Sequence, residues 1–286
     1  MKNKNVGWQR VLLIIVPFLI IDGIFQFIGI LVAGVGFQDL SAPKTEVQEL
    51  IINAFSFLGV LLVIWIFVRF VEKGKMIDLG LLMKDRLPDI ALGLAIGMMI
   101  MGIGYLLLLA MGEIDFQQID FNLAKTLDVI LIFVFVALTE ELLTRGYVLR
   151  NLMVSFNKYV ALILTSALFS LMHFFNPNTD WFSFINLFVA GLLLGVSYIH
   201  TRNLWFPLSL HFSWNVFQTL LGFNVSGQDS YSIIHFQTVG KNLINGGDFG
   251  FEGSILSIVA EVIVIVGIQL YYTRKGNQRA NLVFDE

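Results

Sequence analysis

The chain has 286 residues, of which 57% are hydrophobic and only 14% are charged. Soluble domains carry about 25% charged residues, so this composition excludes an ordinary soluble protein and predicts an integral membrane protein. The net charge of −3 and the lack of a block of basic residues give no indication of nucleic-acid binding. Because the sequence contains no cysteine, it excludes disulfides, a cysteine nucleophile and a thiolate metal site.

Apolar segments that could cross a bilayer recur along the whole chain. A spanning helix needs about 20 predominantly apolar residues. The candidate segments are residues 11–34, 49–70, 89–111, 127–149, 159–176, 182–200, 204–222 and 255–273. The first is too long for the apolar core of a secretory signal, so we expect it to remain as a helix. We therefore predict an all-α, polytopic membrane protein with about eight transmembrane helices, forming a single domain over residues 1–286.

The basic residues predict how these helices are oriented. If the N-terminus is in the cytosol and the spans alternate, only Lys44, Lys125 and Lys241 fall outside, and the other 15 of the 18 Lys and Arg residues fall inside. Cytoplasmic loops are enriched in Lys and Arg, so we predict that both termini are cytoplasmic. We expect a multi-pass protein of the plasma membrane, with the lipid bilayer as its environment. The sequence does not indicate an oligomeric state.

Two further features concern packing and the outer surface. Gly93 and Gly97, like Gly191 and Gly195, are four residues apart and permit close contact between helices. The longest outer connection, residues 224–253, contains turn-forming sequences such as GGDFG. We expect this connection to form a partly ordered cap, whose role the sequence leaves open.

Few ionisable residues lie inside the predicted spans. Such residues are costly in a bilayer and mark either function or pairing. They are Asp22, Asp128, Glu140, Glu141, Arg145, His173, His211 and Glu261. Asp22 and Glu261 each stand alone, in the first and last span. We expect each of these two acids to cap a kink or pair with a neighbouring helix rather than take part in chemistry.

The fourth predicted span carries a pair of acids followed by a base. Glu141 and Arg145 are four residues apart, so their side chains can pair on one face of a helix. Glu140 lies about 100° around the same helix and is free to face another helix. The Glu141–Arg145 pair could simply stabilise the helix at the cytosolic rim of the membrane. A buried Glu140, however, would also be suited to act as a general base.

Two other spans carry a histidine one helical turn from a possible partner, Phe169 with His173 and His211 with Asn215. Taken singly, each has an ordinary explanation. A buried histidine finds a backbone acceptor, Phe169 packs on the ring of His173, and Asn215 bonds a neighbouring helix. Together with Glu140, however, these residues supply what hydrolysis of an amide requires, namely a base that activates water and donors that stabilise an oxyanion.

The three motifs occur in a fixed order on predicted spans: EExxxR at Glu140–Arg145, FxxxH at Phe169–His173 and HxxxN at His211–Asn215. This set resembles the CPBP intramembrane proteases, also called the CAAX protease and bacteriocin-processing family or the Abi family. The resemblance covers residues 125–222, a third of the chain, and no motif residue departs from the pattern. It implies an eight-helix membrane fold and endoproteolysis within or near the bilayer.

The resemblance also implies roles for individual residues. Glu140 would activate water with the help of His173, and His211 and Asn215 would form the oxyanion hole. Supporting roles are implied for Glu141, Arg145 and Phe169. Glu140, His173 and His211 could instead hold Zn²⁺ or another divalent metal, which is why such proteins have been called metalloproteases; we expect no tightly held metal.

Two other functions remain open at this point. A membrane immunity or peptide-binding protein could keep the same fold without catalysis, and a proton-coupled transporter could use Glu140 and Glu141 as a relay. The complete set of acid, histidines and asparagine favours an enzyme, and the lack of a visible inverted repeat disfavours a transporter. HExxH and GxSxG motifs are absent from the sequence. We therefore expect an intramembrane endopeptidase that cleaves a membrane-associated peptide, prenylated or bacteriocin-like.

The predicted span boundaries conflict with this site. At 1.5 Å per residue, Glu140 would lie about 10–15 Å and His173 about 20–24 Å from the inner boundary of the membrane. For the two side chains to meet, the fourth span must start later than predicted, or the fifth must begin deeper or lie tilted.

Overall fold

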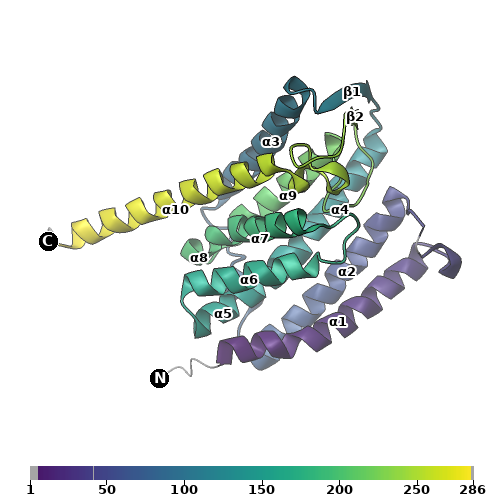
Figure 1. Ribbon diagram of the computed structural model, residues 1–286. Helices are drawn as coiled ribbons and strands as arrows, with labels where there is room; N and C mark the ends of the chain where they lie inside the picture. The colour runs from purple at the N-terminus through teal and green to yellow at the C-terminus, as the bar shows by residue number, and fades with distance from the viewer. Residues whose placement is uncertain (1–5, 41, 285–286) are drawn as a thin grey trace.

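The computed structural model describes residues 6–40 and 42–284, and these are predominantly helical. Every one of the predicted apolar segments coincides with a helix. The helices are α1 (Val6–Val32), α2 (Glu46–Ile66), α3 (Leu87–Ala110), α4 (Leu123–Glu141), α5 (Arg150–Ser155), α6 (Lys158–Met172), α7 (Trp181–Val196), α8 (Tyr198–Thr201), α9 (Trp205–Leu220) and α10 (Ile255–Phe284). They pack in one bundle, with both termini at one end and the connection between α1 and α2 at the other (Figure 1).

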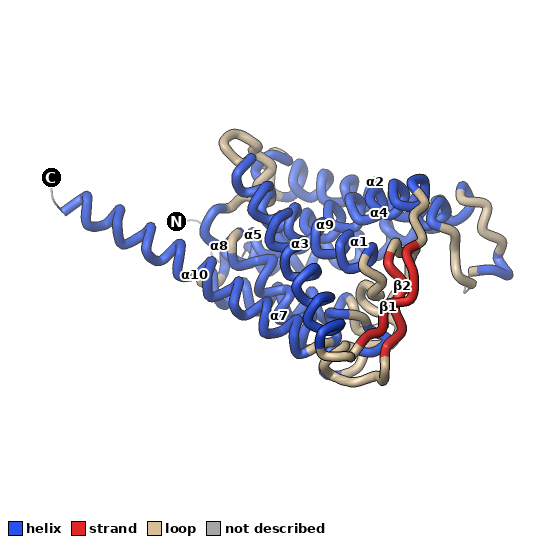
Figure 2. The backbone as a smooth tube through the Cα atoms, turned by 90° about the horizontal axis from the view of Figure 1, so that it is seen from above, coloured by secondary structure: helices blue, strands red, loops and turns tan. Residues whose placement is uncertain are grey.

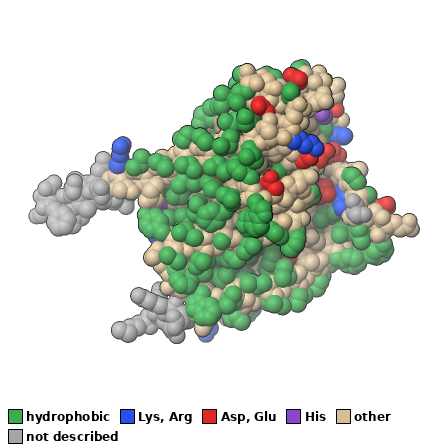
Figure 3. Space-filling model, viewed as in Figure 1, with side chains coloured by type: hydrophobic (Ala, Val, Ile, Leu, Met, Phe, Trp, Pro, Cys, Tyr) green, Lys and Arg blue, Asp and Glu red, His purple; other side chains and the backbone are tan. Residues whose placement is uncertain are grey.

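Five of the described helices are long and apolar enough to cross a membrane. They are Val6–Val32, Glu46–Val71, Leu87–Ala110, Trp181–Thr201 and Ile255–Arg274. Many of their large hydrophobic side chains are exposed, and hydrophobic side chains cover the middle of the face drawn in Figure 3. These helices make the chain an integral membrane protein. The helices α4, α6 and α9, which carry the three motifs, are not among the five, so the number of crossings stays a prediction.

The prediction of an all-α fold misses a small sheet. The strands β1 (Ile114–Ile119) and β2 (Ile234–Thr238) pair antiparallel, with an irregular register between Phe116 and Gln118. Figure 2 shows the two strands crossing the end of the bundle that lies opposite the termini. The strands belong to segments far apart in the sequence, so no local hairpin pattern could have indicated their pairing.

Glycines allow two pairs of helices to approach closely, as the spacing predicts. A Cβ atom added to Gly97 of α3 would lie 2.7 Å from the backbone nitrogen of Trp214 in α9. A Cβ added to Gly191 of α7 would lie 2.9 Å from the Cα atom of Ser166 in α6. Because larger residues cannot occupy these positions without moving the backbone, the glycines fix how deeply α9 and α6 sit in the bundle.

The conflict over depth is resolved by the ends of the helices, which were predicted wrongly. The fourth span does not stop at residue 149, because α4 continues through the π-helix η4 (Leu142–Leu149) into α5, which ends at Ser155. The helix α6 begins at Lys158 and ends at Met172 rather than at residue 176. Glu140 and His173 each lie 15 residues from this shared turn, about 22 Å along either helix, so they reach the same depth.

Candidate active site

The three motifs meet at the bottom of a large cavity. The cavity has a volume of about 1010 Å³, and its lining includes Glu140, His173, His211 and Asn215. One face of α4 forms a wall from Lys125 near its start down to Glu140, and the first turns of α2 and the loop before β2 line the same space. Because these segments lie at the end with β1 and β2, the cavity extends from that end towards the middle of the bundle.

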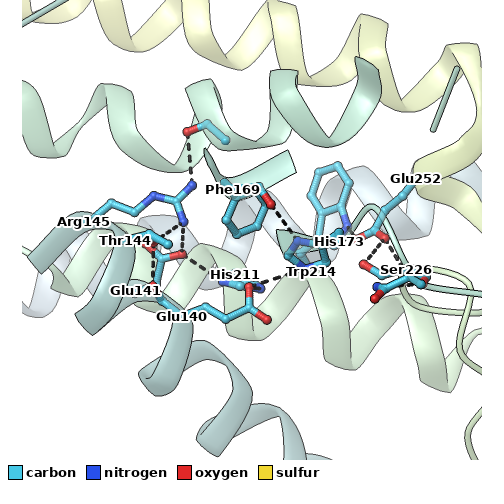
Figure 4. A network of polar contacts seen from close by, with 12 residues as sticks. Glu140, Glu141, Thr144, Arg145, Phe169, His173, His211, Trp214, Ser226 and Glu252 are labelled. Atoms are coloured by element: carbon cyan, nitrogen blue, oxygen red, sulfur yellow. Dashed lines mark hydrogen bonds and ion pairs between the residues drawn. The ribbon is translucent and has the colours of Figure 1, made fainter. Parts of the chain in front are cut away.

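Glu140 stands opposite both motif histidines (Figure 4). Its Oε2 atom lies 3.8 Å from Nε2 of His173 and 3.9 Å from Nε2 of His211. These distances exceed a direct hydrogen bond of about 2.7–3.2 Å. The Oε2 atom is buried and has no hydrogen-bond partner among the described residues. A water molecule slightly off the line between Glu140 and either imidazole can form hydrogen bonds with the carboxylate and with that imidazole. The geometry therefore fits a water molecule shared by Glu140 and a histidine.

The hydrogen-bond partner of each histidine Nδ1 atom determines whether the Nε2 atom that faces Glu140 is a donor or an acceptor. The Nδ1 of His173 lies 2.9 Å from the backbone carbonyl oxygen of Phe169. A carbonyl only accepts, so this Nδ1 carries the proton and the Nε2 of the neutral ring is an acceptor. The Nδ1 of His211 lies 2.9 Å from Oε1 of Glu141 and likewise donates. The negative charge of Glu141 stabilises a positive charge on His211, which would make its Nε2 a donor as well.

Glu141 and Arg145 form a fully buried ion pair, as their spacing predicts. Nη1 of Arg145 donates to Oε1 of Glu141 at 2.9 Å, and neither side chain is exposed. Nη1 also donates to the hydroxyl of Thr144 at 2.8 Å, and Nη2 donates to the backbone carbonyl of Gly191 at 3.1 Å. The ion pair is therefore not a surface staple, because it ties α4 to α7 and, through Glu141, to His211 in α9.

The local backbone separates the two acids. Glu141 is the last residue of α4, and η4 begins directly after it. A π-helix inserts extra residues into a helical turn, and such turns are frequent at functional sites. The hydroxyl of Thr144 donates to the carbonyl of Glu140 at 2.5 Å and so satisfies an acceptor at this transition. Glu140 faces the cavity, whereas Glu141 points to Arg145 and His211.

Phe169 and Asn215 complete the group of predicted residues. The Phe169 ring packs against the ring of His173 with centroids 4.7 Å apart, as predicted. The guanidinium carbon of Arg145 lies over the Phe169 ring, 4.5 Å from the centroid of that ring. This stacking restrains both His173 and Arg145. Asn215 lies one turn from His211 on α9, is buried, and lines the cavity.

The two isolated acids behave differently from each other. Asp22 accepts a hydrogen bond from the hydroxyl of Ser56 in α2 at 2.7 Å, which confirms that it pairs with a neighbouring helix. Glu261 was expected to cap a kink or to pair with a neighbouring helix, and among the described residues its carboxylate bonds no other helix. Its Oε1 accepts only from Ser257 of its own helix, at 3.2 Å, and the residue lines the cavity. A periodicity argument cannot separate these two cases, because both acids are single polar residues on apolar helices.

Sequence reasoning missed a buried acid in the wall of the cavity, Glu252. Glu252 lies in the short 3₁₀ helix η6 (Phe251–Gly253), at the end of the outer connection. Its carboxylate accepts from Nε1 of Trp214 at 3.2 Å and from the backbone and hydroxyl of Ser226, and it lines the cavity. The expected cap over residues 224–253 thus contributes Glu252 to the wall of the cavity. No motif or spacing in the sequence marks Glu252.

The arrangement of the acidic and histidine side chains was compared with that of metal sites. In the part of the chain that the structure describes, no group of three or more His, Asp or Glu side chains is arranged to hold a metal ion. The alternative in which Glu140, His173 and His211 hold Zn²⁺ stays a prediction, and the reaction proposed for the site uses the side chains alone.

Comparison with known proteins agrees with the motifs. Residues 122–217 match a family described as type II CAAX prenyl endopeptidase Rce1-like. The matched segment contains all three motifs and ends before Glu252. No curated protein and no solved structure matches the chain. For the third of the chain that contains the site, the match confirms the intramembrane protease family that the three motifs predict.

Proposed function

We propose that the protein is an intramembrane endopeptidase of the CAAX type that hydrolyses a peptide bond with a glutamate-activated water. The observation that carries the proposal is the meeting of Glu140 with two imidazoles, each Nε2 within 4 Å of the same carboxylate oxygen, in a cavity large enough for a peptide. The family match over residues 122–217 supports the same reaction.

The reaction follows from the donors and acceptors of the site. A water molecule bonded to Oε2 of Glu140 and Nε2 of His173 loses a proton to Glu140 as its oxygen attacks the carbonyl carbon of the substrate. Nε2–H of His211 and the side-chain amide of Asn215 stabilise the oxyanion that develops. When the carbon–nitrogen bond breaks, Glu140 returns the proton to the leaving amine. One water is consumed, and one carboxyl and one amino terminus are produced.

The buried ion pair of Glu141 and Arg145 supports this chemistry by orienting His211. Glu141 accepts from His211 and from Arg145 at once. It therefore orients the imidazole and favours its charged, donating form, while Arg145 holds the Glu141 carboxylate in place inside the bundle. In this proposal Glu141 and Arg145 are positioning residues that act through His211.

A panel of anchored peptides tests the reaction. The purified protein in lipid nanodiscs would be mixed with a farnesylated C-terminal peptide, an unmodified transmembrane peptide and an amphipathic cationic peptide, in water enriched in ¹⁸O. We expect at least one peptide to be cut, with one ¹⁸O atom in the new carboxylate, as mass spectrometry would show. If the folded protein cuts no member of such a panel, the hydrolytic function is wrong and a peptide-binding function without catalysis is favoured.

We further propose that the end with β1 and β2 faces away from the cytosol. Of the 18 basic residues, this end carries only Lys44, Lys125 and Lys241. Because the chain has no cysteine, single reporters can be introduced at the exposed residues Asp115 and Lys84, which lie at opposite ends. In intact cells, a membrane-impermeant maleimide should label Asp115→Cys and spare Lys84→Cys. The reverse pattern would invert the orientation.

A further inference from the structure

The cavity contains a second pair of acids, apart from the motif residues. Glu252 from η6 and Glu261 from α10 both line it, and both are buried. In Figure 4, Glu252 lies beyond Trp214 and His173 as seen from Glu140. Neither acid belongs to the segment 122–217 that matches the protease family. Besides the motif acids, the cavity wall thus contains two buried acids without an assigned role.

Within the described residues, no Lys or Arg neutralises this second pair. Glu252 accepts hydrogen bonds only from Trp214 and Ser226. The carboxylate of Glu261 accepts from Ser257, and its Oε2 atom is fully buried without a hydrogen-bond partner. The imidazoles of His173 and His211 act on Glu252 when they are charged, whereas Glu261 has no basic partner among the described residues, and a buried carboxylate without a counter-charge is costly. A cationic ligand would supply the missing charge.

The surroundings of the pair also suit a cation. Trp214 contacts Glu252 and itself lines the cavity, and an indole ring attracts ammonium and guanidinium groups. Burial raises the pKa of the Glu252 carboxyl, and the hydrogen bonds from Ser226 and the positive charge of the His173 and His211 imidazoles oppose that effect. A bound cation would favour the ionised form of Glu252.

The entrance carries acids in excess of bases. Glu46, Glu49, Asp120 and Asp229 line the cavity near its opening, where the basic side chains are Lys44 and Lys125. Lys125 is 3.8 Å from Glu46, and Lys44 donates to the backbone carbonyl of Leu40. A passage with this balance of charge concentrates cations and repels anions.

We propose that Glu252 and Glu261 form a subsite for a basic group of the peptide substrate, a Lys or Arg side chain or a free α-amino group, beside the bond that is cleaved. This inference rests on the proposed function, because it assigns a preference to the same cavity. The bound ammonium or guanidinium lies between the two carboxylates, next to Trp214, while the scissile carbonyl reaches Glu140 and His211.

Binding rather than turnover tests the subsite. The full chain with Glu140→Gln would be placed in nanodiscs, and the affinity of two acetylated decapeptides would be measured, identical except for a central lysine or norleucine. Norleucine keeps the alkyl chain and lacks the ammonium group. Loss of a buried charge partner predicts about 30-fold weaker binding of the norleucine peptide. An arginine peptide, and a norleucine peptide with a free amino terminus, show which cation is preferred.

The decisive variants add Glu261→Gln or Glu252→Gln to this background. We expect Glu261→Gln to bind the lysine and norleucine peptides with nearly equal affinity. We expect Glu252→Gln to reduce the preference for the lysine peptide. Asp22→Asn is the matched control, because Asp22 is an intramembrane carboxylate that pairs with Ser56 and does not line the cavity. Since Glu252 also holds Trp214 and Ser226, unfolding temperatures would be compared, and Glu261→Gln alone decides the question if Glu252→Gln is poorly folded.

The outcomes separate this inference from the proposed function. An unchanged lysine preference in well-folded Glu261→Gln, or no preference in the parent, would overturn the subsite. A lower unfolding temperature without a change in the affinity ratio would make the two acids structural, which also overturns it. If the wild-type protein hydrolyses nothing but lysine preference depends on Glu261, the subsite stands and the hydrolytic function falls.

Discussion

Glu140→Gln is expected to lower kcat for peptide hydrolysis by about 10²–10⁴-fold, the usual contribution of a general acid–base group. Glutamine keeps the shape of glutamate but cannot take a proton from water. Because Oε2 of Glu140 has no hydrogen-bond partner among the described residues, the exchange breaks no bond that holds the fold. The unfolding temperature should therefore stay close to that of the wild type, and so should substrate binding. Steady-state cleavage of the best peptide in the panel, together with thermal unfolding in nanodiscs, would measure both effects.

The control for this prediction is again Asp22→Asn, a carboxylate-to-amide exchange inside the bundle. Asp22 accepts from Ser56 and Gln26 and lies outside the cavity, so its amide variant should retain normal turnover. Equal rates for Glu140→Gln and the wild type would show that another group activates the water. A loss of the same size in Asp22→Asn would show that the assay reports general damage to the bundle.

Arg145→Met is expected to destabilise the protein by about 3–5 kcal/mol, because it leaves a buried charge without its partner. Arg145 and Glu141 are both fully buried and 2.9 Å apart. The guanidinium also donates to Thr144 and to the carbonyl of Gly191. Methionine fills part of the space but supplies none of these donors. A lower yield of folded protein and a large fall in unfolding temperature would be measured, with any residual activity per folded molecule.

Two comparison variants give this prediction its specificity. Arg145→Lys keeps the charge but cannot donate in the same fork to Glu141 and Gly191, so it should fall between wild type and Arg145→Met. Arg86→Met removes a similar pair, Arg86 with Asp89 at 2.8 Å, in which both side chains are about a third exposed. That change should cost no more than about 1 kcal/mol. A stable Arg145→Met protein would contradict the positioning role.

The sequence predicts the helices and the meeting of the motifs well, because both depend on short-range patterns. Apolar runs of about 20 residues mark membrane helices, and residues four apart share a helix face. This is enough to place Glu141 against Arg145 and Phe169 against His173, and to leave Glu140 free. The depth of the site was misjudged because apolar composition does not mark the continuation of α4 through η4 to Ser155.

The parts that could not be predicted depend on contacts between distant segments. The strands β1 and β2 carry no hairpin signal, since each finds its partner more than a hundred residues away. Glu252 looks like any acid of a polar loop until the fold brings it beside Trp214. Glu261 resembles Asp22 in the sequence, and only the packing of α10 shows that one acid faces the cavity while the other bonds Ser56.

The segments that line the cavity differ from those that carry the motif residues, and this affects how substrate preference can change. The groups proposed to break the bond lie within residues 122–217, whereas η6, β2, α10 and the start of α2 supply much of the remaining wall. Substitutions in those outlying segments can change which peptide fits without touching the reactive groups. Under the proposed function, exchanging η6, β2, α10 or the start of α2 for the corresponding segments of a related protein should therefore change substrate preference while leaving Glu140, His173 and His211 in place.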